Sequence, residues 1–108
     1  MKHLLSSTAF IVLNKDLARK VGLKSAVLLA DLISKEEYFI ANGMTEGWFF
    51  NTEANIEQDT TLTPFQQRKC LKTLEMHLLV DTKRKGIPAK RYFKINQEQV
   101  LQILKNLS

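Results

Sequence analysis

The chain has 108 residues and a formal net charge of +5 at pH 7, and 44% of its residues are hydrophobic and 25% charged. This length provides one hydrophobic core and is too short for two domains, and the composition is typical of a folded globular protein rather than a disordered one. No apolar run approaches about 18 residues, so we expect no membrane span. The N-terminus faintly resembles a signal peptide, but polar residues interrupt its apolar run, and we expect a mature cytoplasmic protein.

Candidate catalytic and metal-binding residues are few. Cys70 is the single cysteine, which excludes an internal disulfide and a cysteine-rich metal cluster. His3 and His77 are far apart in sequence, and neither has a second histidine or a carboxylate at ligand spacing. The Gly-rich phosphate loop and the GxSxG and HExxH patterns are missing. We therefore expect a protein that is not an enzyme and that needs no metal and no other cofactor.

Three elements are expected in the first part of the chain. The short apolar run at residues 9–13 is typical of a strand. Asn14 can cap a brief helix over residues 15–21, which Gly22 would end. Residues 24–39 contain no helix-breaking residue and are apolar on most of their surface, so they predict a central buried helix. Its polar seam is formed by Lys24, Asp31 and Lys35.

A strand and a helix-turn-helix follow. Three consecutive aromatic residues at 48–50 favour a short strand. Asn51 or Thr52 can cap a helix of about eight residues, and residues 60–63 turn the chain into a second helix. We therefore expect a helix-turn-helix over about residues 51–78.

The second helix of this pair has a well-marked start. Thr63 can cap it through its hydroxyl, Pro64 suits the first helical position because it has no N–H, and Gln66 can complete a capping box. Helical periodicity gives the helix two faces. The packing face is formed by Gln67, Cys70, Leu71, Leu74, His77 and Leu78. The other face, which is basic, is formed by Phe65, Arg68, Lys69, Lys72, Thr73 and Met76.

The sequence next alternates as two strands around Gly86-Ile87-Pro88, which predicts a hairpin, or wing, over about residues 79–95. Positive charge is concentrated on this hairpin and on the preceding helix. Residues 63–91 contain eight basic and two acidic side chains, a net charge of +6, so the rest of the chain is close to neutral. A solvated basic surface is the simplest alternative, but such concentration is typical of proteins that neutralise phosphates.

The last predicted element is an amphipathic helix over about residues 96–107. Its apolar side is formed by Val100, Ile103, Leu104 and Leu107. That side must be buried either against its own domain or against the same helix of a second chain, and the pattern alone does not choose between them. We expect a homodimer, because a domain of this size has limited core surface for its helices to cover.

This order of elements is that of a winged helix-turn-helix, an α+β, mainly α fold with a small antiparallel sheet and a C-terminal helix, and it makes residues 1–108 a single domain. The chain resembles the N-terminal domain of phage replication initiator or replisome-organiser proteins. The segments that carry the resemblance are LNKDLA (13–18), VGL (21–23), GWFFN (47–51), TTLT (60–63), QR (67–68) and LLVDTKRKGIPAKRY (78–92). Its most specific part is GIPAKRYF (86–93).

The fold is also similar to the front domain of DnaD-type primosome proteins, where the resemblance implies self-association as much as DNA contact. Initiators of this group continue into a further domain, so the resemblance leaves open whether the chain is part of a longer initiator or a stand-alone relative. Gln67 departs from the generic winged helix, which has an aliphatic residue at this packing position. A bond to the turn is the one role that we assign to it.

Our leading interpretation is a module that binds double-stranded DNA in replication initiation of a phage or plasmid type. Arg68 is the first candidate for base contact, Phe65 can touch a thymine methyl or a protein partner, and Thr63 can donate to a phosphate at the helix start. The predicted DNA-binding residues are Thr63, Phe65, Arg68, Lys69, Lys72, Thr73, Lys83, Arg84, Lys85, Lys90 and Arg91.

Other functions are kept open. The main alternative is a protein-interaction or oligomerisation module of a replisome or primosome, in which replication proteins are the partners and the basic charge is incidental. A small transcriptional regulator is another. RNA binding is disfavoured because the lone tryptophan and most aromatic residues fall on predicted strands or packing positions and form no stacking platform. A nuclease has least support, since no carboxylate pair has a metal-binding arrangement.

Overall fold

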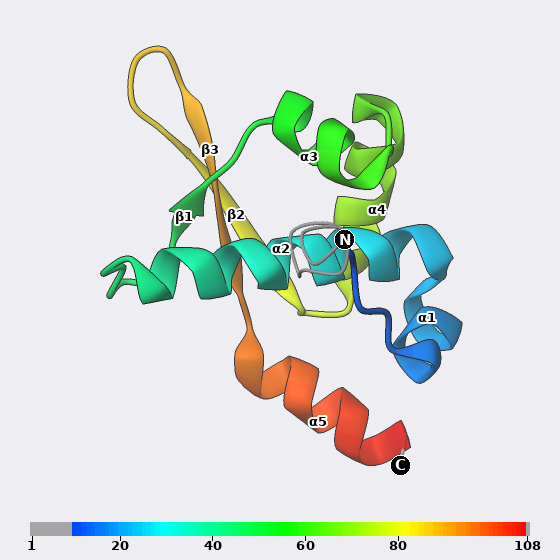
Figure 1. The fold of residues 1–108 in the computed structure, drawn as a ribbon. Coiled ribbons are helices and arrows are strands. Elements are labelled where there is room, and N and C mark those ends of the chain that lie inside the picture. Colours follow the sequence, from blue (N-terminus) through cyan, green and yellow to red (C-terminus); the bar gives the residue numbers. More distant parts are fainter. Residues whose placement is uncertain (1–9, 108) are drawn as a thin grey trace, which may run out of the picture.

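A computed structural model describes residues 10–107, with side chains up to Lys105. Its elements are α1 (Lys15–Val21), α2 (Leu23–Ala41), β1 (Phe49–Phe50), α3 (Glu53–Thr60), α4 (Pro64–Met76), β2 (Val80–Lys85), β3 (Lys90–Ile95) and α5 (Gln97–Leu107) (Figure 1). Within the described residues, five helices and a three-stranded antiparallel sheet make an α+β, mainly α architecture, which is consistent with the predicted winged helix-turn-helix.

Local signals place both ends of α1 and the start of α4 where the sequence predicts them. The Asn14 side chain caps α1 by accepting a hydrogen bond from the Leu17 N–H at 2.9 Å. Gly22 ends α1 with a φ of 93°, which glycine adopts without steric cost, and the same residue precedes α2. At α4, Thr63 and Gln66 form a complete capping box. The direction in which α4 leaves the turn is therefore fixed by its own first residues.

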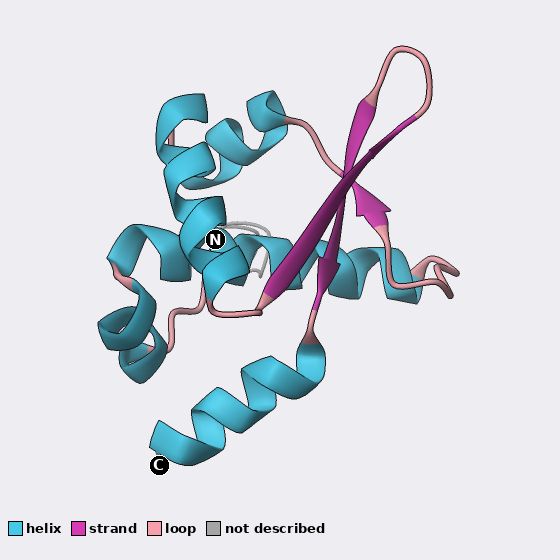
Figure 2. Cartoon of the chain, turned by 180° about the vertical axis from the view of Figure 1, so that it is seen from behind, coloured by secondary structure: helices cyan, strands magenta, loops and turns pink. Residues whose placement is uncertain are grey.

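The sheet has the strand order β1-β3-β2, and both pairings are antiparallel. Its inner face packs on the helices through Val80, Phe49, Phe93 and Ile95, all of them buried. The strands cross in front of α2 in Figure 2, so this view looks onto the outer face of the sheet. β2 and β3 form a hairpin (residues 80–95), which we call the wing, and its tip projects away from the helices (Figure 1).

α2 is the centre of the domain. Leu28, Leu29 and Leu32 are at most 1% exposed, and α1, α3, α4 and β3 all pack against this helix. Ile56 of α3 and Leu74 of α4 belong to the same core, which holds the helix-turn-helix against α2. Because neighbours surround α2, its sequence is apolar on more than one side.

Two expectations about single elements are wrong, one about a strand near the N-terminus and one about the end of α4. Residues 10–14 form no strand, since every pairing of the described sheet involves β1, β2 and β3, and residue 9 lies outside the described part of the chain. Leu78 does not continue the packing face of α4. The helix ends at Met76, and Leu78 takes a left-handed φ of 61° with 65% of its side chain exposed.

The surface assigned to a second chain also needs correction. Val100 and Ile103 lie in the core of their own domain, 9% and 6% exposed, and Leu104 packs against the same core. The side chain of Leu107 lies outside the described residues. α5 returns to pack beside α1, so the amphipathic pattern is satisfied within one chain. Val100 and Ile103 are therefore core residues and cannot be the contacts of a homodimer in this arrangement.

Candidate nucleic-acid interface

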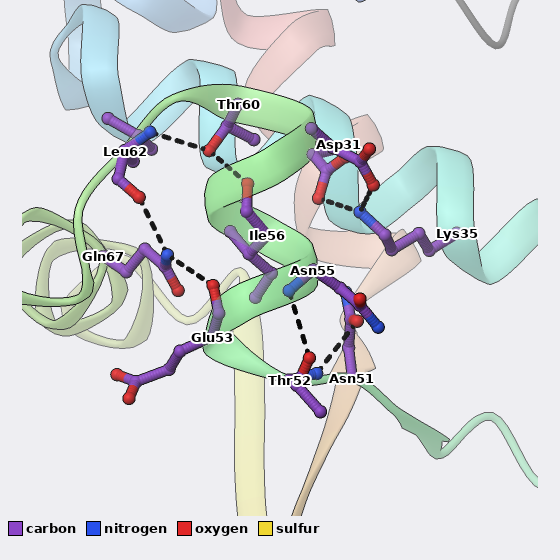
Figure 3. Close-up of polar contacts among 11 residues, drawn as sticks. Asp31, Lys35, Asn51, Thr52, Glu53, Asn55, Ile56, Thr60, Leu62 and Gln67 are labelled. Atoms are coloured by element: carbon purple, nitrogen blue, oxygen red, sulfur yellow. Dashed lines mark hydrogen bonds and ion pairs between the residues drawn. The ribbon is translucent and has the colours of Figure 1, made fainter.

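A buried side-chain amide fixes α3 relative to α4. Gln67 is 1% exposed, and its Nε2 donates to the backbone carbonyls of Leu62 in the turn and of Glu53 at the start of α3, at 2.9 and 3.0 Å (Figure 3). The predicted bond from Gln67 to the turn is confirmed, and a second bond reaches α3. An aliphatic side chain here would leave both carbonyls without this donor, which explains the polar residue at a packing position.

The turn between the two helices is fixed by Thr60. Its hydroxyl donates to the Ile56 carbonyl at 2.6 Å and accepts from the Leu62 N–H at 3.1 Å (Figure 3). The next residue, Thr61, has a left-handed φ of 68°. Together with Gln67, these bonds give α4 one orientation and its outer face one direction.

A buried ion pair supports α3 from α2. Asp31 belongs to the predicted polar seam of α2, and it is 5% exposed because α2 is covered on this side. The Lys35 Nζ lies 2.5 Å from Asp31 Oδ2 and 2.9 Å from the Oδ2 of Asp59 on α3 (Figure 3). Burial raises the pKa of the Asp31 carboxyl, and the bond to Lys35 opposes that shift. Lys35 is therefore part of the scaffold.

Glu53 places a carboxylate between α4 and the wing. Its Oε2 lies 3.0 Å from the Arg68 Nη1 and 4.0 Å from the Arg91 Nη1. Arg91 is half-buried, with its guanidinium carbon 4.9 Å from the centre of the Phe93 ring. Burial lowers the pKa of Arg91, Glu53 opposes this shift, and Arg84 and Arg68 add to it. Arg68 is exposed but held by an ion pair, whereas Arg91 forms part of the junction between wing and helix-turn-helix.

The predicted basic face of α4 lies on the solvent side of the helix. Arg68, Lys69 and Lys72 are exposed, and Phe65 is 64% exposed. The Lys69 Nζ lies 5.5 Å from the centre of the Phe65 ring, so the cation and the ring form one surface. Thr73 is half-buried on the same helix. This face combines cations with an apolar side chain, as contact with both phosphates and base edges requires.

Two threonines of this face have part of their hydrogen-bonding capacity in use. The Thr73 hydroxyl donates to the Lys69 carbonyl at 3.4 Å. The Thr63 hydroxyl oxygen accepts from the Gln66 N–H at 3.2 Å as the helix cap. A hydroxyl can accept and donate at once, so the Thr63 proton can still be given to a phosphate. Of the two, Thr63 therefore keeps the donor that its predicted contact with a phosphate requires.

The five wing cations do not share one face. Side chains along a strand alternate between its two sides, and the register pairs Arg84 with Arg91 and Lys85 with Lys90. Because Arg91 lies beside Glu53, the arginine pair is on the inner side, toward α4. The predicted single basic surface is thus divided. On the outer side of the wing are Lys83, Lys85 and Lys90.

The outer face of the sheet also carries three aromatic side chains that the sequence did not identify as a group. The ring centres of Phe50 and Tyr92 are 5.9 Å apart, the Lys83 Nζ lies 4.2 Å from the centre of the Trp48 ring, and the Lys90 Nζ lies 5.2 Å from that of Phe50. The prediction placed most aromatics on strands or at packing positions and did not anticipate that these three share the outer face of the sheet. A period of two in β3 was the available signal. Its outer residues are Lys90, Tyr92 and Lys94.

The described residues offer no metal site and no membrane-spanning helix. Within residues 10–107, no group of three or more His, Cys, Asp or Glu side chains could hold a metal ion. No helix in the same part of the chain has both the length and the apolar character needed to cross a bilayer. Cys70 is buried in the core, as its predicted packing role requires. The basic and aromatic surfaces of α4 and the sheet are the features that call for a ligand.

No protein-family model and no curated protein matches the sequence. Solved structures with the same fold do match. One, described as "N-Terminal domain of DNA binding protein", has a TM-score of 0.64 at 16% identity, over 90% of this chain and 85% of that chain. Another, "Structure of Rep-DNA complex", has a TM-score of 0.62 at 16% identity, again over 90% of this chain and 85% of that chain. At this identity, the likeness shows a shared fold.

Proposed function

We propose that the chain is a non-enzymatic module that binds double-stranded DNA. The observation that carries the proposal is the exposed basic face of α4, which the Gln67 bonds and the capping box hold in one orientation. The inner side of the wing adds two arginines beside it. The titles of the two structural neighbours, a DNA binding protein and a Rep-DNA complex, support the same ligand class.

In this proposal α4 enters the major groove, and the wing follows the backbone or the adjacent minor groove. Arg68 reads a base, and it exchanges its ion pair with Glu53 for that contact. Lys69, Lys72 and the wing cations bind phosphates, and Thr63 donates to one at the start of α4. The helix thus supplies sequence preference and the wing supplies general affinity.

We place this activity in phage or plasmid-type replication initiation, in the cytoplasm. The wing motif at residues 86–93 and the neighbouring Rep-DNA complex support that placement. A small transcriptional regulator would make the same DNA contacts and differ in what it recruits. The two roles can be separated by asking which proteins the DNA-bound chain retains, replication proteins or RNA polymerase.

We retain the homodimer as a proposal with a revised surface. The groove between residues 10–12, α2 and α5 exposes Phe10, Val12 and Tyr38 at 53%, 89% and 63%. A second copy that covers these side chains would bury apolar area that one chain leaves in water. Sedimentation equilibrium at tens of micromolar tests this, because a monomer at that concentration contradicts the dimer.

The test of duplex binding is fluorescence anisotropy with a short random duplex, measured between about 50 and 200 mM salt. With about four to six phosphates neutralised, the slope of log K against log salt should be about −4 to −5. Replacing Arg68, Lys69 and Lys72 of α4 together by alanine should weaken binding and make the slope shallower.

The matched control changes the same amount of charge on α1. Lys15, Arg19 and Lys20 are exposed there and are assigned no DNA contact, so their combined replacement by alanine should change affinity much less. A flat salt response of the unmutated chain, or equal losses in the two triple variants, would overturn the proposal.

A further inference from the structure

We propose that the outer face of the sheet is a second nucleic-acid site, which binds single-stranded DNA by stacking unpaired bases on Trp48, Phe50 and Tyr92. This site lies on the opposite side of the sheet from Glu53 and the arginine pair of the wing. Its lysines also belong to the wing cations proposed to bind duplex phosphates, but its ligand and its aromatic contacts differ from those proposed for the duplex. Changes to the rings therefore test this site independently of duplex binding.

The three rings cluster on the outer side of β1 and β3, with Trp48 directly before β1. Phe50 is the cross-strand partner of Tyr92, and their ring centres lie 5.9 Å apart with planes at 51°. Trp48 precedes Phe50 by two residues and therefore points to the same side, about 7 Å further along. The Lys83 Nζ contacts its ring from β2, which confirms that side. Successive bases of an unstacked strand can thus meet successive rings.

These rings are accessible, whereas their inner counterparts make the core. Phe49 and Phe93 are 2% and 1% exposed, and Phe50 is 36% exposed. Trp48 and Tyr92 are half-buried. Figure 2 faces this side of the sheet, and no described helix crosses in front of the strands. Burial in the core accounts for the inner pair, whereas the outer three rings pack only in part and keep surface open to a ligand.

The charge of this face suits a polyanion. Its lysines outnumber its acids, since Asp81 is the one acidic residue in the paired strands and lies opposite Lys94. Glu46 and Asp81 border the end of the face near Lys94, which leaves the end toward the wing tip purely basic. A phosphate backbone would lie along that basic end. The lysines concerned are Lys83, Lys85 and Lys90.

The lysines that now cover the rings do not prevent stacking. The Lys83 Nζ is 4.2 Å from the Trp48 ring centre, and the Lys90 Nζ is 5.2 Å from that of Phe50. A cation–π contact between exposed groups is weaker than the stacking of a base on an aromatic side chain. An incoming base can therefore displace the ammonium group, which then meets the phosphate of the same nucleotide.

Stacking also decides between ligand classes. A duplex hides the faces of its bases, so it could use the lysines of this surface but not the rings. An acidic protein surface would likewise pair with the lysines but make no use of the aromatic faces. Single strands bring both the phosphates and the free base faces that the surface fits.

The chain contains a single tryptophan, so selectively excited tryptophan fluorescence reports on this face alone. Titration of the whole chain with oligo(dT) should quench Trp48 emission. An oligonucleotide of the same length with abasic sites carries the same phosphates and no bases, and it should quench much less. Phe50→Leu and Tyr92→Leu keep apolar bulk without a ring, and each should weaken oligo(dT) binding about tenfold, while Tyr92→Phe should retain it.

The α4 triple variant described above separates the two sites. It should lose duplex affinity and keep oligo(dT) quenching. If the unmutated chain quenches with oligo(dT) but binds no duplex, only the proposed function falls.

Equal quenching by the abasic oligonucleotide, or no quenching at all, overturns the single-strand site. So does a random duplex that quenches Trp48 as strongly as oligo(dT) and competes with it, because this face would then belong to the duplex site. Far-UV circular dichroism of the leucine variants shows that they are folded, and the comparison of normal with abasic strands needs no variant.

Discussion

The helix-turn-helix and the wing both carry cations, but the protein holds them in opposite ways. α4 is tied by a buried amide, a fixed turn and a capping box, and its Arg68 is further held by Glu53. The wing is held by its strand pairing and, at its base, by the contact of Arg91 with Glu53, while at its tip Ile87 is fully exposed. The difference indicates two kinds of contact. Base edges require donors in a set geometry, whereas phosphates can be met by cations that adjust.

Gln67→Ala should loosen α4 from α3 and have the largest effect on stability. It removes both hydrogen bonds to the carbonyls of Leu62 and Glu53 and leaves a cavity, so we expect a loss of about 3 kcal/mol in the free energy of unfolding. Urea denaturation measures this. Lys72→Ala, an exposed change on the same helix, should shift it by less than about 0.5 kcal/mol. If the two variants are equally stable, the amide does not hold α3 against α4.

Lys35→Met should have the next largest effect, a loss of about 2 kcal/mol in the free energy of unfolding near neutral pH. The change leaves the buried Asp31 carboxylate without its partner. Burial already raises the pKa of Asp31 in the folded state. Ionisation of such a group costs stability as the pH rises through the folded pKa, and this cost is absent below the unfolded pKa. The variant's deficit should therefore shrink between about pH 7 and pH 4. A deficit that stays constant with pH would mean that Asp31 is not the group involved.

The third test compares the two regions directly. Arg68→Ala should cost about 1.5 kcal/mol on a preferred duplex and little on random DNA, because it removes a base contact. Replacing Lys83, Arg84 and Lys85 together by alanine should weaken all duplexes alike, by about tenfold, with a shallower salt slope. Both variants should unfold at the urea concentration of the unmutated chain. Equal losses on specific and random duplexes in the two variants would contradict the assignment of base contact to Arg68.

Glu53→Gln should have the smallest effect on DNA affinity. It frees Arg68 from its ion pair and so tests how far that pair limits the contact of Arg68 with DNA. Without the carboxylate, Arg68 no longer has to give up an ion pair to reach its base, so we expect affinity for the preferred duplex to rise about threefold, with little change on random duplexes. Glu57→Gln removes the same charge from an exposed position on α3 and serves as the control. Equal gains in both variants would show that only net charge had changed.

Local features of the fold were predictable because their causes are local. The Asn14 cap, the Gly22 stop and the capping box at Thr63 each depend on residues within a few positions, and they fix the start and end of α1 and the start of α4. Periodicity likewise indicated that one side of α5 is buried. It could not say against what, because that depends on how the chain returns past α1.

The site was predictable as a set of residues more than as an arrangement. The basic face of α4 lies where helical periodicity put it. The contacts of Glu53 with Arg68 and Arg91 join residues far apart in sequence, and no pattern along the chain encodes them. The alternation of side chains along each strand encodes the two faces of the wing. The charge of the wing was counted over both strands together, and that total does not show how the cations divide between the two faces.

The left-handed turn residue has a consequence for engineering. Thr61 is β-branched and exposed, and its φ of 68° is one that such side chains adopt with strain. Glycine at this position would relieve that strain and could raise the stability of the domain by about 1 kcal/mol. The change removes no side chain assigned to either nucleic-acid surface. A Thr61→Gly background would therefore keep damaging variants folded long enough to be purified and measured.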